Sequence, residues 1–161
     1  MATTNYANKL GVYVPEKVFN SYNVTALRNV LIETNQNDLR VNKRIGQLYC
    51  RAYDDDEWED MTSLLDDDAV FTSMWGVTQG LEAAKTIASE ERERFVLTFT
   101  TPLRPLTDST FFREGTLQEV DRSRNLLGKY RTRDVIEYLS VVKGYVTTRT
   151  LALKFNLKYD Y

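Results

Sequence analysis

The sequence that decides the fold runs from Tyr49 to Lys85: YCRAYDDDEWEDM at residues 49–61, LLDDDAVF at residues 64–71 and GLEAAK at residues 80–85. The first segment predicts a helix that ends in acids. These acids then precede a second short helix, where the helix dipole favours negative charge. Ala-Val-Phe begins a strand and Gly80 leads into a third helix, so the expected order in this part of the chain is two helices, a strand and a helix.

Periodicity extends this pattern in both directions. A helix is expected from Asp38 to Asp54, because its apolar residues recur every three or four positions. The second helix is expected to end at the acids 66–68, before a strand over 69–74. Later segments are rich in β-branched and aromatic residues and predict strands at 95–101, 110–120, 130–142 and 145–159, with Lys143-Gly144 as a hairpin turn. Helices followed by strands indicate an α+β domain with one bent antiparallel sheet.

This order of elements resembles the nuclear transport factor 2-like superfamily, which includes SnoaL-like cyclases and ketosteroid isomerases. The resemblance covers residues 38–159 and is best over 45–88. It implies a cystatin-like roll, in which N-terminal helices close a cone-shaped bent antiparallel β-sheet around a pocket. We therefore divide the chain into an N-terminal arm, residues 1–37, and a SnoaL-like domain, residues 38–161.

The resemblance also implies candidate catalytic residues. The ketosteroid-isomerase branch places a Tyr on the first helix as a hydrogen-bond donor to an oxyanion, and Tyr49 lies at the matching position. The position of the carboxylate base of that branch is occupied here by Ser73, or by Thr72 beside it, and neither residue can act as a base unaided. The second acid corresponds most nearly to Asp134. Two arginines close to Asp134 favour its charged form, so a surface ion pair is the alternative account.

Other branches of the superfamily carry acids on the late strands, often with an arginine between them. No acid occurs from Tyr138 to Tyr159, so Arg149 has no carboxylate partner on its own strand. The pocket walls are expected to be apolar, and ordinary core packing is the alternative for each wall residue. The candidates are Tyr53, Trp58, Phe71, Met74, Trp75, Phe99, Phe112 and Tyr138.

Composition excludes several classes of site. The 161 residues include no histidine and one cysteine, Cys50, which removes Ser-His and Cys-His nucleophile systems, cysteine metal clusters and nearly all zinc sites. The acidic runs 54–57 and 66–68 lack the spacing of a calcium loop and fit helix termini better. We expect no metal and no cofactor.

Charge and hydropathy limit the partners. The sequence pI of about 5.3 argues against a nucleic-acid-binding domain, although basic residues cluster over 122–133. No apolar run is long enough to span a membrane, and residues 1–9 do not have the pattern of a secretory signal. We expect a cytoplasmic protein.

Two functions follow from these observations. The first is a SnoaL-like domain that binds a small apolar or aromatic molecule in the cone, with an activity of the polyketide-cyclase, isomerase or dehydratase (lyase) type. The second is a non-catalytic module that forms a homodimer or joins a larger assembly. The aromatic N-terminal arm and the outer face of the sheet are the surfaces expected to serve such an assembly.

Overall fold

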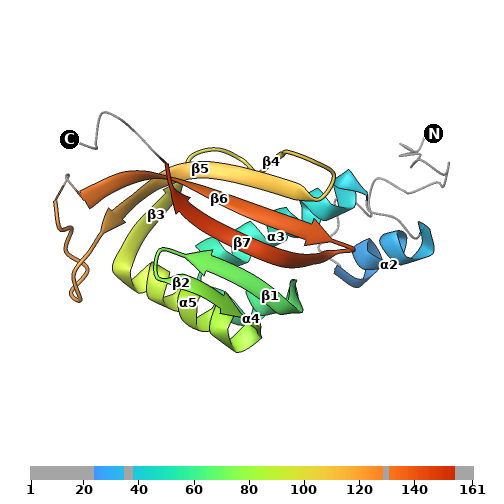
Figure 1. Ribbon diagram of the computed structural model, residues 1–161, viewed down its shortest axis with the longest axis horizontal. Coiled ribbons are helices and arrows are strands. Elements are labelled where there is room, and N and C mark those ends of the chain that lie inside the picture. Colours follow the sequence, from blue (N-terminus) through green and yellow to red (C-terminus); the bar gives the residue numbers. More distant parts are fainter. Residues whose placement is uncertain (1–23, 35–37, 129–130, 155–161) are drawn as a thin grey trace.

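The computed structural model describes residues 24–34, 38–128 and 131–154. It confirms an α+β fold (Figure 1). The helices are α2 (Val24–Thr34), α3 (Leu39–Asp54), α4 (Trp58–Ser63) and α5 (Leu81–Arg94). The strands are β1 (Leu65–Ser73), β2 (Gly76–Gln79), β3 (Phe95–Phe99), β4 (Arg104–Pro105), β5 (Thr110–Glu119), β6 (Thr132–Val142) and β7 (Tyr145–Leu153).

Helix α3 begins where the sequence predicts it. The Asp38 carboxylate accepts hydrogen bonds from the backbone N–H groups of Arg40 and Val41, so it caps the first turn. The helix then presents one apolar face to the sheet, with Ile45 and Tyr49 fully buried. It ends at Asp54, which places this carboxylate at the edge of the core.

The strands of the described residues form one sheet in the order β2-β1-β7-β6-β5-β3, and β4 pairs with β5. All pairings are antiparallel except that of β1 with β7, which is parallel. The predicted bent antiparallel sheet is confirmed except at this pair, where β1 and β7 run parallel. Parallel neighbours need a long connection, and here the chain from β2 to β6 supplies it.

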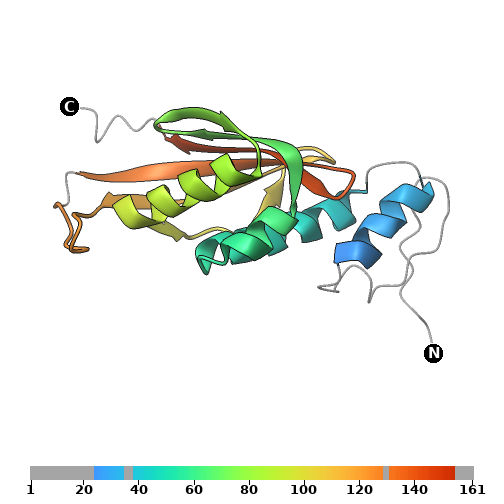
Figure 2. The ribbon, with the colours of Figure 1, turned by 90° about the horizontal axis from the view of Figure 1, so that it is seen from below.

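Helices α3, α4 and α5 all lie on one face of the curled sheet (Figure 2). Along β5, buried residues alternate with half-buried ones, so Phe111, Arg113, Gly115 and Leu117 point towards the helices. The core therefore lies between α3 and this concave face. The opposite face of β5, β6 and β7 is not covered by any described helix.

Two details of the predicted boundaries were wrong. The acids 66–68 lie inside β1 and do not end α4, because pairing with β7 begins earlier: Leu65 is in register with Val146, whose N–H donates to the Leu64 carbonyl at 2.9 Å. Strand β4 was not predicted. The predicted extension of the last strand to Tyr159 lies outside the described residues beyond Lys154.

Helix α2 lies within the predicted arm but packs on the domain. Its Leu27 and Leu31 are buried in the main core. Arg28 stacks 3.7 Å above the Tyr145 ring and donates from Nε to the Gly144 carbonyl at 2.8 Å. These contacts fix α2 against the hairpin between β6 and β7. The remainder of the arm, residues 1–23 and 35–37, is outside the described residues.

Candidate functional site

The aromatic side chains of α3 lie at the centre of the concave face. Tyr49 and Tyr53, one turn apart, stack with ring centroids 6.1 Å apart. Phe71 of β1 meets Tyr49 edge-on at 6.3 Å, and Trp58 meets Tyr53 edge-on at 6.0 Å. Offset and edge-to-face contacts of this kind are the favoured arrangements of aromatic rings. They hold both tyrosines in fixed positions.

Four charged side chains share this apolar interior. They are Glu91 of α5, Arg113 of β5, Glu137 of β6 and Arg149 of β7, and each side chain is at most 5% exposed. Their charges sum to zero. Ionised groups are tolerated in a protein interior only when they are paired and hydrogen-bonded, and these four pair with one another.

Glu137 is the centre of the cluster. One of its oxygens accepts from Arg113 Nε at 2.6 Å and the other from Arg149 Nε at 2.9 Å. Arg149 also donates from Nη1 to Glu91 at 2.7 Å, and the Tyr53 hydroxyl donates to the same carboxylate at 2.9 Å. An arginine therefore bridges two buried carboxylates, one from β6 and one from α5.

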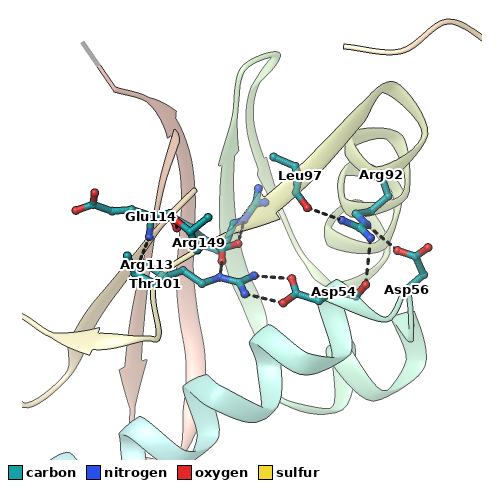
Figure 3. Close-up of polar contacts among 10 residues, drawn as sticks. Asp54, Asp56, Arg92, Leu97, Thr101, Arg113, Glu114 and Arg149 are labelled. Atoms are coloured by element: carbon teal, nitrogen blue, oxygen red, sulfur yellow. Dashed lines mark hydrogen bonds and ion pairs between the residues drawn. The ribbon is translucent and has the colours of Figure 1, made fainter. Parts of the chain in front are cut away.

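The cluster reaches the surface at the end of α3. Arg113 donates two hydrogen bonds, at 2.8 and 2.9 Å, to the carboxylate of Asp54, whose side chain is 41% exposed (Figure 3). Its guanidinium also stacks 3.5 Å above the Phe99 ring. Close to this point, Arg92 of α5 bonds to the Asp54 carbonyl and to Asp56. This end of the cluster is the one that solvent approaches.

Electrostatics fix the protonation states in the cluster. Burial alone would raise the pKa of Glu137, but the guanidiniums of Arg113 and Arg149 outweigh it and hold that pKa below its usual value. Burial would likewise lower the pKa of Arg149, but the neighbouring Glu91 outweighs it, so Arg149 stays charged. Burial raises the pKa of Tyr49 and of Tyr53 well above the usual value, so both remain hydrogen-bond donors.

The Tyr49 hydroxyl is an unsatisfied group of this site. Arg149 Nη2 also forms no hydrogen bond of good geometry, but it lies 2.7 Å from a Glu91 oxygen in an ion pair, whereas the Tyr49 hydroxyl has no such partner among the described residues. The hydroxyl is completely buried and has no hydrogen-bond partner among the described residues. The charge of Glu137 contributes to its raised pKa, so the hydroxyl lies within electrostatic range of the cluster. A buried polar group without a partner is rare in native proteins and calls for a specific explanation.

The predicted site residues divide between the two faces of the sheet. Tyr49, Tyr53, Trp58, Phe71 and Phe99 come together around the buried cluster. The structure does not bring the other candidates to this point. Phe112 and Tyr138 are register partners on the outer face, Asp134 is on that face opposite Thr116, Trp75 is 43% exposed and stacks on Phe95, and Met74 packs at the edge of the core.

Ser73, the residue at the position of the expected base, has a structural role. Its hydroxyl accepts from the Trp75 N–H at 3.1 Å and donates to the Gly76 carbonyl at 3.4 Å, within the turn between β1 and β2. Arg149 has no acid on its own strand, as the sequence showed. Its carboxylate partners come from the neighbouring strand and from α5.

Sequence reasoning missed Glu91, Arg113 and Glu137, although a signal for them exists. Glu137 occupies an inward position of a strand whose inward neighbours are Val135 and Leu139. Glu91 similarly continues the buried face of α5. A charged residue in register with a buried apolar face is a candidate for a buried ion pair.

Other kinds of site find no support within the described ranges. No three histidine, cysteine, aspartate or glutamate side chains of residues 24–34, 38–128 and 131–154 are grouped so that they could hold a metal ion. None of the helices in those ranges has the length and apolar character needed to cross a membrane.

Comparison with known proteins agrees with this architecture. The model of the NTF2-like domain family matches residues 27–157. The chain belongs to this family. No curated protein matches it in sequence.

Solved structures show the same fold at low sequence identity. An NTF2-like protein from Burkholderia xenovorans is 14% identical with a TM-score of 0.57, covering 70% of this chain and 88% of its own. A candidate ketosteroid isomerase from Kribbella flavida is 17% identical with a TM-score of 0.55, covering 71% and 78%. A candidate polyketide cyclase from Pseudomonas putida is 13% identical with a TM-score of 0.54, covering 73% and 92%. At these identities the similarity concerns the fold alone.

Proposed function

We propose that a small molecule that carries a hydrogen-bond acceptor binds beside Tyr49 on the concave face, and that Tyr49 is the donor to it. The buried, unpaired hydroxyl of Tyr49 is the observation that carries the proposal. Leaving such a group unsatisfied costs about 1–3 kcal/mol, and a bound acceptor removes that cost. The Phe71 and Tyr53 rings beside Tyr49 provide apolar walls, which suit an apolar or aromatic molecule with one carbonyl or similar oxygen.

The charged cluster supports proton transfer as the chemistry of this site. Two arginines hold Glu137 ionised and make it a weak base, so we assign it to positioning. Glu91 accepts a hydrogen bond from Tyr53, and a single arginine, Arg149, contacts it through Nη1 and Nη2, each at 2.7 Å. It is the carboxylate we assign as the proton acceptor. A tyrosine donor with a carboxylate base fits an isomerase or cyclase reaction, the classes named for two of the structural neighbours.

Native mass spectrometry tests the binding proposal. The protein is exposed to a cell extract, repurified gently and measured beside Tyr49→Phe and Tyr138→Phe. The Tyr138 ring is on the outer face of the sheet and 39% exposed, which makes it a matched control. We expect a bound small molecule on the wild type and on Tyr138→Phe, and its loss from Tyr49→Phe.

Thermal stability separates loss of binding from loss of fold. Tyr49→Phe removes the unsatisfied hydroxyl and keeps the ring, so the ligand-free variant should be as stable as ligand-free wild type or up to about 3 kcal/mol more stable. A bare wild type, or one small molecule retained equally by all three proteins, would contradict the assignment of Tyr49. If the wild type carries no small molecule, an ordered water is the remaining partner for the Tyr49 hydroxyl.

A second candidate function is homodimerisation through the outer face of the sheet. No described helix covers this face of β5, β6 and β7, where Phe112 and Ile136 are half-buried and Tyr138 is exposed beside them. Light scattering coupled to size-exclusion chromatography should show a dimer that Tyr138→Glu converts to a monomer. A wild-type monomer would remove this candidate, and the binding proposal would be unaffected.

A further inference from the structure

A hollow outside the buried cluster is lined mainly by residues of α2, α3 and α4. It is a groove with a volume of about 400 Å³. Its floor is apolar, because Ala52 and Leu64 are buried there and Leu48 is half-buried. This volume is within the range of sites that receive a ligand or a few side chains.

The rim of the groove is acidic. Glu57 and Asp60 lie there beside Arg51, and all three side chains are exposed, while Arg28 reaches the groove with a hydrogen bond from Nη2 to the Ser63 carbonyl at 3.0 Å. The Asp60 carboxyl raises the pKa of the neighbouring Glu57, which shows that the two acids are close together. An occupant of this groove should therefore combine apolar side chains with at least one positive charge.

The chain itself leads into the groove. Val24, the first residue of α2, is one of the residues that line it. The sequence immediately before Val24 is PEKVFNSYN, residues 15–23. It contains Phe19 and Tyr22 as large apolar residues, Lys17 as a cation and Glu16 as an acid. An extended chain spans at most about 3.5 Å per residue, so Tyr22 is within about 7 Å of Val24 and Phe19 within about 17 Å.

We propose that residues 15–23 of the same chain occupy this groove, with Phe19 and Tyr22 on its apolar floor and Lys17 facing Glu57 and Asp60. Proximity and apolar content favour this segment. Its binding buries Leu48 and continues the packing that Leu27 and Leu31 of α2 begin on the core. The N-terminal arm then belongs to the monomer, so the outer sheet face is the surface left for a second copy.

Disulfide trapping in the full-length chain tests this placement. Ser63 is an exposed residue of the groove and Ser21 lies between the two proposed anchors, so the pair Ser21→Cys and Ser63→Cys should form a disulfide on treatment with diamide. Thr86 on the exposed side of α5 gives the control pair, Ser21→Cys with Thr86→Cys. The native Cys50 can stay, because it is buried and burial raises the pKa of its thiol.

The expected result is an intramolecular disulfide in at least tenfold greater yield for the Ser63 pair than for the Thr86 pair. Adding Phe19→Ala and Tyr22→Ala should reduce that yield to the level of the control while the circular dichroism spectrum stays native. Equal yields for the two pairs, or no disulfide in either, would overturn the proposal. Disulfides formed only between two chains would assign the groove to a second copy.

Discussion

At the scale of single residues, the unusual feature of this protein is the amount of charge inside its core. Glu137 is fully buried and serves two arginines at once. Buried ion pairs are weak evidence for stability, because desolvation offsets much of the attraction between the charges. Removing one member, in contrast, leaves an uncompensated charge in the interior. The cluster is therefore a place where conservative substitutions should have large effects.

Glu137→Gln keeps the shape of the side chain and removes its charge. Arg113 and Arg149 then retain Asp54 and Glu91 respectively, so we expect a loss of about 3 kcal/mol in the free energy of unfolding, the low end for breaking a buried pair. Urea unfolding followed by circular dichroism measures it. Glu114→Gln is the control, since its ion pair with Lys154 is partly exposed and should change the stability by less than about 1 kcal/mol. Similar losses in both variants would contradict a special role for the buried charge.

The two buried tyrosines should be visible in an alkaline titration. Burial raises the pKa of Tyr49 and of Tyr53 above the ordinary value of about 10, so their stabilising contribution is complete below that pH and is lost as the pH rises through their folded pKa values. Absorbance at 295 nm should show exposed tyrosines ionising near pH 10. Tyr49 and Tyr53 should ionise in a second step at higher pH, when the protein unfolds. In the double variant Tyr49→Phe and Tyr53→Phe, the contribution of these two residues to that second step should disappear. Ionisation of all tyrosines in one step near pH 10 would show that neither is buried in solution.

At the scale of the elements, one close approach positions the outer end of the cluster. Gly115 of β5 is in register with Phe99 of β3, and a Cβ at Gly115 would lie 2.7 Å from the Phe99 Cα and closer still to the Thr98 carbonyl. Both contacts are with backbone atoms, which cannot move away by a change of rotamer as a side chain could. The absence of a side chain at residue 115 thus lets β3 bring the Phe99 ring under the Arg113 guanidinium.

Gly115→Ala should therefore push β3 away from β5. We expect a destabilisation of about 3 kcal/mol, the upper part of the range for overpacking, measured as a shift in the urea midpoint. Thr116→Ala on the opposite face of the same strand is the matched control and should cost less than about 1 kcal/mol. A Gly115→Ala protein as stable as Thr116→Ala would mean that the two strands are not this close in solution.

The elements also show what the sequence can predict. Helix α3 and the late strands follow from periodicity and from the cap at Asp38, since local patterns determine them. The parallel pairing of β1 with β7 depends on segments about 80 residues apart, and no local pattern encodes it. The buried cluster was missed for a similar reason. Its members come from four different elements. The only signal for them in the sequence is a charged residue at a position whose neighbours on the same face of the element are apolar and buried.

At the scale of the whole molecule, the cluster links the elements that form the concave face. It joins the end of α3 to β5, β6, β7 and α5 through one chain of hydrogen bonds from Asp54 to Glu91. Protonation of its central carboxylate should therefore affect the stability of the entire domain, and unfolding should remain a single transition. The pH dependence of stability follows from the direction of the Glu137 pKa shift.

The pKa of Glu137 is lower in the folded protein than the ordinary value of about 4.3. Its contribution to stability is complete at pH values above the unfolded pKa, and it is lost as the pH falls through that value towards the folded one. Stability should thus be level from neutral pH to about pH 5.5 and then decline. Thermal unfolding of the wild type and of Glu137→Gln between pH 3 and 7 measures this, and their difference in stability should narrow as the pH falls. A constant difference over the whole range would mean that Glu137 is not the ionised centre of the cluster.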